Sequence, residues 1–188
     1  MATTSDVTPL GSPLPGGHLA AADGATHDLD DLTDDGPVLL AFLSNHCPYV
    51  RHIEEAFGRA AAELIARGIT VLGISSNDAT SHPQDGHDGM AAQVERAGWS
   101  FPYLRDPDQV LARAVGAVCT PDLFLYDRDR RLAYRGAFDG STPGNGVPLT
   151  GGDLRAAADA VLAGRPAPAE QRPAVGCGIK WRPGNEPA

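Results

Sequence analysis

The sequence has little lysine, and its positive charge is dispersed. Lys180 is the only lysine in 188 residues, and the arginines are scattered along the chain rather than clustered. The formal net charge is −9, and acidic residues are concentrated between positions 28 and 35. A surface that follows a phosphate backbone needs the opposite arrangement. We therefore expect neither a nucleic acid nor an anionic membrane surface as a partner.

Long apolar runs are also lacking. The longest candidate, residues 38–43, has the length of a strand, whereas a membrane-spanning helix needs about 20 apolar residues. Residues 1–15 show neither the basic nor the apolar region of a secretory signal. These absences lead us to expect a cytoplasmic protein.

Cysteine is scarce, with Cys47, Cys119 and Cys177 as the only three. In a reducing cytosol such cysteines are more readily reactive, metal-binding or buried thiols than a disulfide framework. His46 and His52 flank Cys47, but their spacing matches no zinc pattern, and a second pair of ligands is missing. We expect no metal and no cofactor.

The apolar pattern predicts alternating strands and helices. Residues 38–43 predict a strand buried on both faces, and the three- and four-residue spacing after Pro48 predicts a helix that ends at Gly68. Further elements are expected as a strand at 69–75, helices around 90–97, 107–115 and 153–162, and a hairpin at 123–134. Asp106 is the expected N-cap of one helix, with Pro107 at its first position, and Thr150 and Asp153 form an expected capping pair. The order predicts an α/β fold with a central mixed sheet flanked by helices.

The ends of the chain differ in composition from its middle. Residues 1–19 predict a flexible N-terminal arm, and residues 20–165 predict one domain that opens with a hairpin at Asp23-Gly24. Residues 166–188 form a Pro-rich tail that carries Cys177, and we expect Ile179 and Trp181 to dock it.

His82 and His87, in a polar loop with Asp85 and Asp88, are expected to be solvated. The Gly-rich stretch 136–152 lacks the strand-to-helix placement of a phosphate-binding loop.

Cys47 occupies the junction between the first core strand and the first long helix. The N-terminus of a helix carries unpaired N–H groups and a partial positive charge, which stabilise a thiolate relative to a thiol. Pro48 suits the first helical position. This placement favours a reactive cysteine, although a cysteine that only fills space at the junction would fit the same pattern.

Three motifs resemble the alkyl hydroperoxide reductase/thiol-specific antioxidant family of thioredoxin-like proteins: Asn45-His-Cys-Pro-Tyr-Val50, Cys119-Thr-Pro-Asp122 and Gly176-Cys-Gly-Ile-Lys-Trp181. The resemblance covers roughly residues 20–182 and implies a thioredoxin-like fold with a cis bond before Pro121. Val50 replaces the second cysteine of a Cys-X-X-Cys motif, which excludes a local disulfide. Leu40 stands where a peroxiredoxin usually has proline.

The resemblance also implies roles for residues around Cys47. Ser44 and His46 precede the cysteine, and Thr120 lies in the segment that carries the cis proline. Ser44 could hydrogen-bond a thiolate or a peroxide, and Arg135, on a later strand, is the arginine expected to complete the site. Pro48 and Pro121 belong to the same expected set.

The expected function is thiol-dependent redox catalysis. Cys47 would attack a hydroperoxide or a disulfide, and a second cysteine would resolve the product before a thiol reductant, such as a thioredoxin-type donor, restores the thiols. Either Cys119 or Cys177 could resolve, and we favour Cys177 because a tail can move. The alternatives are a non-enzymatic redox sensor or binding module, and a fold whose site has lapsed. The oligomeric state cannot be deduced from the sequence.

Overall fold

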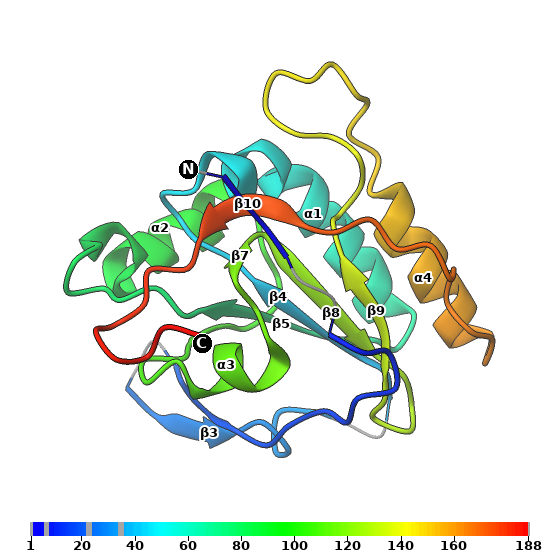
Figure 1. Cartoon of the computed structure of the whole chain (residues 1–188), viewed down its shortest axis with the longest axis horizontal. Coiled ribbons are helices and arrows are strands. Elements are labelled where there is room, and N and C mark those ends of the chain that lie inside the picture. The colour runs from blue at the N-terminus through cyan, green and yellow to red at the C-terminus, as the bar shows by residue number, and fades with distance from the viewer. Residues whose placement is uncertain (1, 6–7, 22–23, 34–35, 188) are drawn as a thin grey trace.

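A mixed β-sheet forms the centre of the molecule. The computed structural model describes residues 2–5, 8–21, 24–33 and 36–187, and in this part of the chain a seven-stranded sheet has the order β3-β2-β6-β5-β4-β8-β9 (Figure 1). Strand β4 is parallel to β5, and β5 to β6, whereas β8 and β9 continue the sheet in antiparallel fashion. The strands are β2 (His18–Ala20), β3 (Thr26–Asp28), β4 (Val38–Phe42), β5 (Thr70–Ser75), β6 (Tyr103–Arg105), β8 (Asp122–Tyr126) and β9 (Leu132–Gly136). The expected α/β fold with a mixed sheet is confirmed.

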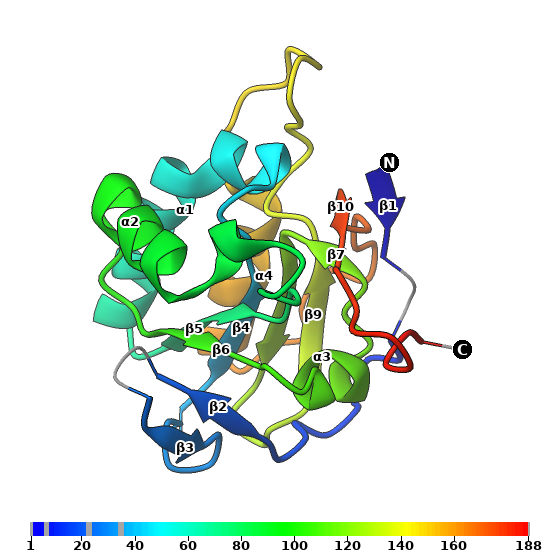
Figure 2. The ribbon, with the colours of Figure 1, turned by 90° about the vertical axis from the view of Figure 1, so that its left-hand side faces the viewer.

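Helices cover both faces of this sheet because β4 is apolar on both sides. Leu39 and Ala41 face one core cluster with α1, α2 and α4, whereas Val38 and Leu40 face a second cluster with α3 and the C-terminal tail (Figure 2). The helices are α1 (Pro48–Ala66), the 3₁₀ helix η1 (Pro83–Asp85), α2 (His87–Ala97), α3 (Val110–Val115) and α4 (Gly152–Leu162). None of the helices in the described residues is long and apolar enough to cross a bilayer.

A small antiparallel sheet joins the two ends of the chain. It has the order β1-β10-β7 and is formed by β1 (Ala2–Thr4), β10 (Val175–Gly178) and β7 (Cys119–Thr120). Figure 2 shows β1 and β10 side by side, on the side of the main sheet where α3 lies. The tail continues from β10 into the second core cluster, where Ile179 is buried and Trp181 packs against it. The expected domain limits at residues 20 and 166 remain predictions.

Both expected hairpins are present. Strands β2 and β3 pair antiparallel, and Gly24 between them has a φ of 86°, while Asp23 lies outside the described residues. Strands β8 and β9 pair antiparallel around Asp127 and Arg130.

The expected capping of two helices is wrong in detail. Helix α3 begins at Val110, so Pro107 is not its first residue; the Asp106 carboxylate still accepts the backbone N–H groups of Leu111 and Ala112, at 3.3 and 2.9 Å. Asp106 therefore accepts N–H groups of the first helical turn although it lies four residues before the helix begins. In α4 the N-cap is Gly151, not Thr150, and its φ of 67° is a left-handed conformation that glycine adopts without strain.

Candidate active site

Cys47 is the N-cap residue of α1. The central strand β4 leads through a short loop to this position, and Pro48 occupies the first turn of the helix, where a missing N–H costs nothing. The carbonyl of Cys47 accepts the Arg51 N–H at 3.0 Å, which closes that turn. The side chain itself is 0% exposed. The thiol is thus fixed at the positive end of a 19-residue helix.

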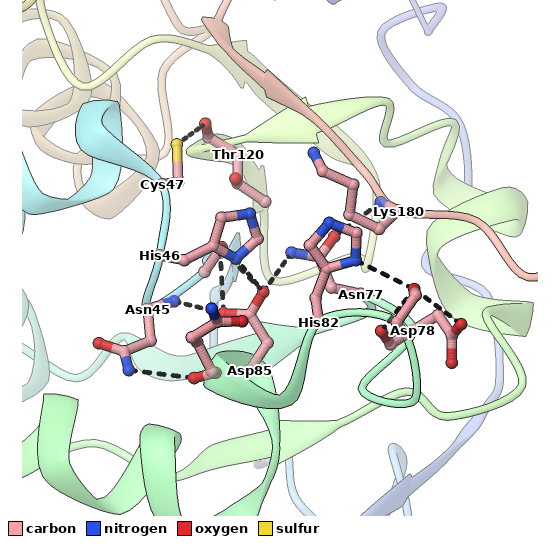
Figure 3. Close-up of polar contacts among 12 residues, drawn as sticks. Asn45, His46, Cys47, Asn77, Asp78, His82, Asp85, Thr120 and Lys180 are labelled. Carbon is pink, nitrogen blue, oxygen red and sulfur yellow. Dashed lines mark hydrogen bonds and ion pairs between the residues drawn. The ribbon is translucent and has the colours of Figure 1, made fainter.

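The cis-proline segment faces this thiol. The peptide bond between Thr120 and Pro121 is cis, as the resemblance implied. The Cys47 thiol donates a hydrogen bond to the Thr120 carbonyl, with 3.1 Å between sulfur and oxygen (Figure 3). Two segments that are 73 residues apart in sequence therefore meet at the sulfur.

Cys177 reaches the same place from the tail. Strand β10 pairs with β7 in a register that sets Cys177 opposite Thr120. Burial raises the pKa of the Cys177 thiol to about 11, and a hydrogen bond to the Cys47 side chain adds to this shift. Both cysteines therefore lie at Thr120, and both are free thiols.

Cys119 and Arg135 both lie close to Asp122. Burial, followed by the charge of Asp122, raises the pKa of Cys119 far above its usual value. The Arg135 guanidinium donates to Thr8 Oγ1 and to the Gly116 carbonyl, both at 2.6 Å, and to an Asp122 carboxylate oxygen at 3.4 Å. The described contacts of Arg135 are with these groups and with the Phe124 ring rather than with Cys47.

Ser44 Oγ and the Nδ1 edge of the His46 ring are directed toward Asp85. This carboxylate is 0% exposed, although it comes from the polar loop in which His82 and His87 were expected to be solvated. Loop residues gather around it because a buried charge requires hydrogen-bond donors. The donors are the Asn45 N–H at 2.6 Å, His46 Nδ1 at 2.6 Å, Asn77 Nδ2 at 2.7 Å and Ser44 Oγ at 3.1 Å (Figure 3).

His82 is also part of this cluster. Its ring stacks on that of His46, with centroids 5.1 Å apart. His82 is only partly exposed, whereas His87, the other histidine expected to be solvated, is exposed. The Asn-His-Cys motif indicates His46 from the sequence alone. Its partners Asp85 and His82 are far along the chain, and the fold of the η1 segment brings them into contact with it. Within the described residues, no group of three or more His, Cys, Asp or Glu side chains could hold a metal ion.

A family model now accounts for most of this domain. The model of the AhpC/TSA family matches residues 10–135, which include Cys47 and the cis-proline segment. The chain belongs to the AhpC/TSA family. A comparison with curated proteins gives no significant match.

Two solved structures resemble this AhpC/TSA protein over nearly its whole length. A hypothetical protein from Sinorhizobium meliloti is 45% identical, with 97% of this chain and 100% of the other covered and a TM-score of 0.93. An uncharacterized conserved protein from Geobacillus kaustophilus is 42% identical, with 97% of each chain covered and the same TM-score of 0.93. The similarity includes both the N-terminal segment and the tail.

A more distant neighbour shows the fold alone. A protein from Chlorobium tepidum named as the thiol:disulfide interchange protein DsbE is 22% identical over 83% of this chain and 99% of the other, with a TM-score of 0.63. The fold is therefore thioredoxin-like. Together with the family, this fold supports a thiol-dependent oxidoreductase role.

Proposed function

We propose that this protein reduces hydroperoxides or disulfides through Cys47, with Cys177 as the resolving cysteine. The observation that carries the proposal is that both cysteines lie against Thr120 at the N-terminus of α1, Cys47 through a hydrogen bond of 3.1 Å and Cys177 through the register of β10 with β7. A resolving thiol must come close enough to the reacting sulfur to form a bond. Strand β10 brings Cys177 there without a change of fold.

The hydroperoxide cycle has two protein steps. The Cys47 sulfur attacks the O–O bond, takes up an OH group to become a sulfenic acid, and releases an alcohol. The Cys177 sulfur then attacks the sulfenic sulfur, and a Cys47–Cys177 disulfide forms with release of water. A thiol donor of the thioredoxin type reduces this disulfide. With a disulfide substrate, Cys47 attacks the S–S bond, forms a mixed disulfide and releases one substrate thiol. Cys177 then attacks the mixed disulfide and releases the second thiol, which leaves the Cys47–Cys177 disulfide.

Variants that each lack one cysteine test which thiol resolves the oxidised Cys47. After one equivalent of peroxide, Cys177→Ser should accumulate sulfenic acid at Cys47, which a sulfenic-acid probe traps, because its neighbouring thiol is gone. Cys119→Ser is the matched control and should still form the disulfide, since burial raises the pKa of the Cys119 thiol far above its usual value and disfavours the thiolate that would attack. Peptide mass spectrometry distinguishes the products. If Cys119→Ser blocks the disulfide and Cys177→Ser does not, the assignment of the resolver is wrong.

The alternative hypothesis is that the protein is a redox sensor. A sensor would undergo the same oxidation once, without sustained turnover. Steady peroxide consumption in the presence of a thiol donor, measured for the parent and for Cys47→Ser, separates the two. An enzyme should consume many equivalents, and Cys47→Ser should consume none above background.

A further inference from the structure

The hydrogen bond between His46 and Asp85 determines which nitrogen of the imidazole is free. Nδ1 lies 2.6 Å from the Asp85 carboxylate, which can only accept when ionised. Nδ1 therefore carries a proton, and in the neutral ring Nε2 keeps its lone pair. Figure 3 shows Nε2 on the far side of the ring from Asp85, toward the side where Cys47, Thr120 and Lys180 lie.

The ring is also held against rotation. His82 stacks on one face of His46, and three other groups of the chain hold Asp85 in place. The His46 side chain nevertheless remains 24% exposed, so that its free nitrogen is not sealed in the core. An imidazole that is oriented by a buried carboxylate and partly open to solvent is suited to proton transfer.

The charges around His46 come from four segments of the chain. Asp85 comes from η1, Cys47 from the start of α1, Asp78 and His82 from the loop after β5, and Lys180 from the tail. Burial, followed by the positive charges of His46 and Lys180, lowers the pKa of His82. The lowered pKa favours the neutral form of the His82 ring that stacks on His46.

We propose that His46, oriented by Asp85, carries the proton for the reaction of Cys47; the proposal rests on the function proposed above. His46 Nε2 accepts the proton of the Cys47 thiol as the sulfur electron pair attacks the terminal oxygen of a hydroperoxide. The O–O bond breaks, the sulfur is oxidised by two electrons to a sulfenic acid, and the leaving alkoxide takes the proton from Nε2. Asp85 is a positioning residue that stabilises the imidazolium between the two transfers.

The tail is connected to the same carboxylate. Asn77 donates to Asp85 through Nδ2, and its Oδ1 accepts the backbone N–H of Lys180 at 2.8 Å. Lys180 lies three residues beyond Cys177. The Asn77 side chain thus links Asp85, which orients His46, to the tail segment that carries Cys177.

The test isolates the first chemical step. In a Cys177→Ser background, the rate at which peroxide converts Cys47 to sulfenic acid is measured from pH 5 to 9 with a trapping reagent and mass spectrometry. His46→Asn is the decisive variant, because the asparagine amide can still donate to Asp85 in place of Nδ1 but has no counterpart of Nε2. His87→Asn, which replaces an exposed histidine at the start of α2, is the matched control.

We expect His46→Asn to lower the rate at pH 7 at least tenfold, and to change the pH profile of the rate, because the imidazole that carries the proton is gone. Asp85→Asn should lower the rate by a smaller factor, and His87→Asn should match the parent. Free imidazole should restore part of the rate to a His46→Ala variant with a parental circular dichroism spectrum, which a purely structural role of His46 would not allow.

A His46→Asn variant with the parental rate and pH profile would overturn the proposal, as would the failure of imidazole to restore any rate in folded His46→Ala. The outcome for the parent separates this inference from the proposed function. If Cys47 of the parent is not oxidised at all, the proposed function fails first. If it is oxidised and all histidine variants behave alike, only the role of His46 fails.

Discussion

Gly176 shows how closely a single residue limits the geometry around the two thiols. A Cβ atom at this position would lie 1.9 Å from the Thr120 carbonyl oxygen and 2.6 Å from its carbon. Both atoms belong to backbone, which cannot rotate away as a side chain can. Strand β10 can therefore approach the cis-proline segment, with Cys177 opposite Thr120, only because residue 176 has no side chain.

Replacement of this glycine should detach β10 from the site. We expect Gly176→Ala to lower the free energy of unfolding by about 2 kcal/mol, as for overpacked positions, and to speed the alkylation of Cys47, which is fully buried in the parent. Denaturant unfolding and peptide mass spectrometry measure the two effects. Gly16→Ala is the control, since its Cβ would meet no atom within 4 Å. Parental stability together with a protected Cys47 in Gly176→Ala would contradict the expectation.

Strand β10 and the residues after it form an element that is held from several sides. The strand pairs with β1 and β7, the Ile179 N–H donates to the Val118 carbonyl at 2.9 Å, and Gln109 donates to the Lys180 carbonyl at 2.9 Å. The Ile179 side chain is 5% exposed and belongs to the second core cluster. These contacts, rather than the mobility expected of a Pro-rich tail, place Cys177 next to Cys47.

Loss of the Ile179 anchor should expose the site. Ile179→Ala should cost about 3 kcal/mol of stability, in the range of buried aliphatic truncations, and should increase the alkylation rate of Cys47 under native conditions. Val147→Ala, which shortens a valine that is 44% exposed, is the control and should change neither quantity. Denaturant unfolding and peptide mass spectrometry measure the stability and the alkylation rate. Equal alkylation rates in Ile179→Ala and the parent would show that the tail does not protect the thiol.

On the scale of the whole molecule, a buried contact between Arg135 and Asp122 connects two neighbouring antiparallel strands of the main sheet with the N-terminal segment. Arg135 on β9 reaches Asp122 on β8, the carbonyl of Gly116 and the hydroxyl of Thr8. Burial raises the pKa of Asp122 to about 7, although Arg135 opposes this shift. Ionisation of Asp122 in the folded chain therefore lowers the free energy of unfolding of the domain.

The sign of the resulting pH dependence follows from proton binding. Between about pH 4 and 7 the folded chain keeps a proton on Asp122 that the unfolded chain releases, so the free energy of unfolding should fall as the pH rises. The slope for one proton is at most about 1.4 kcal/mol per pH unit. Asp122→Asn should flatten this part of the profile, whereas Asp129→Asn, at an exposed turn, should not. Urea unfolding at a series of pH values measures this, and equal slopes in all three proteins would contradict it.

The sequence predicted the elements with strong local signals and missed several of the short strands. The apolar run of β4 and the periodic stripe of α1 placed Cys47 at a helix N-terminus, as observed. Strands β1, β6, β7 and β10 contain only two to four residues each, too few for a periodic pattern. Their pairing depends on partners far along the chain, so no local pattern indicates them.

By itself, the sequence determined the α/β order, the helix terminus at Cys47, and the family, through motifs whose residues are contiguous. Only the tertiary structure decided which groups meet there: Thr120 and Cys177 at the sulfur, and Asp85 under His46. The physical reason is that local order follows from short-range backbone preferences and apolar periodicity. Contacts between distant segments depend instead on the burial of the whole core and on the need to supply each buried polar group with a partner.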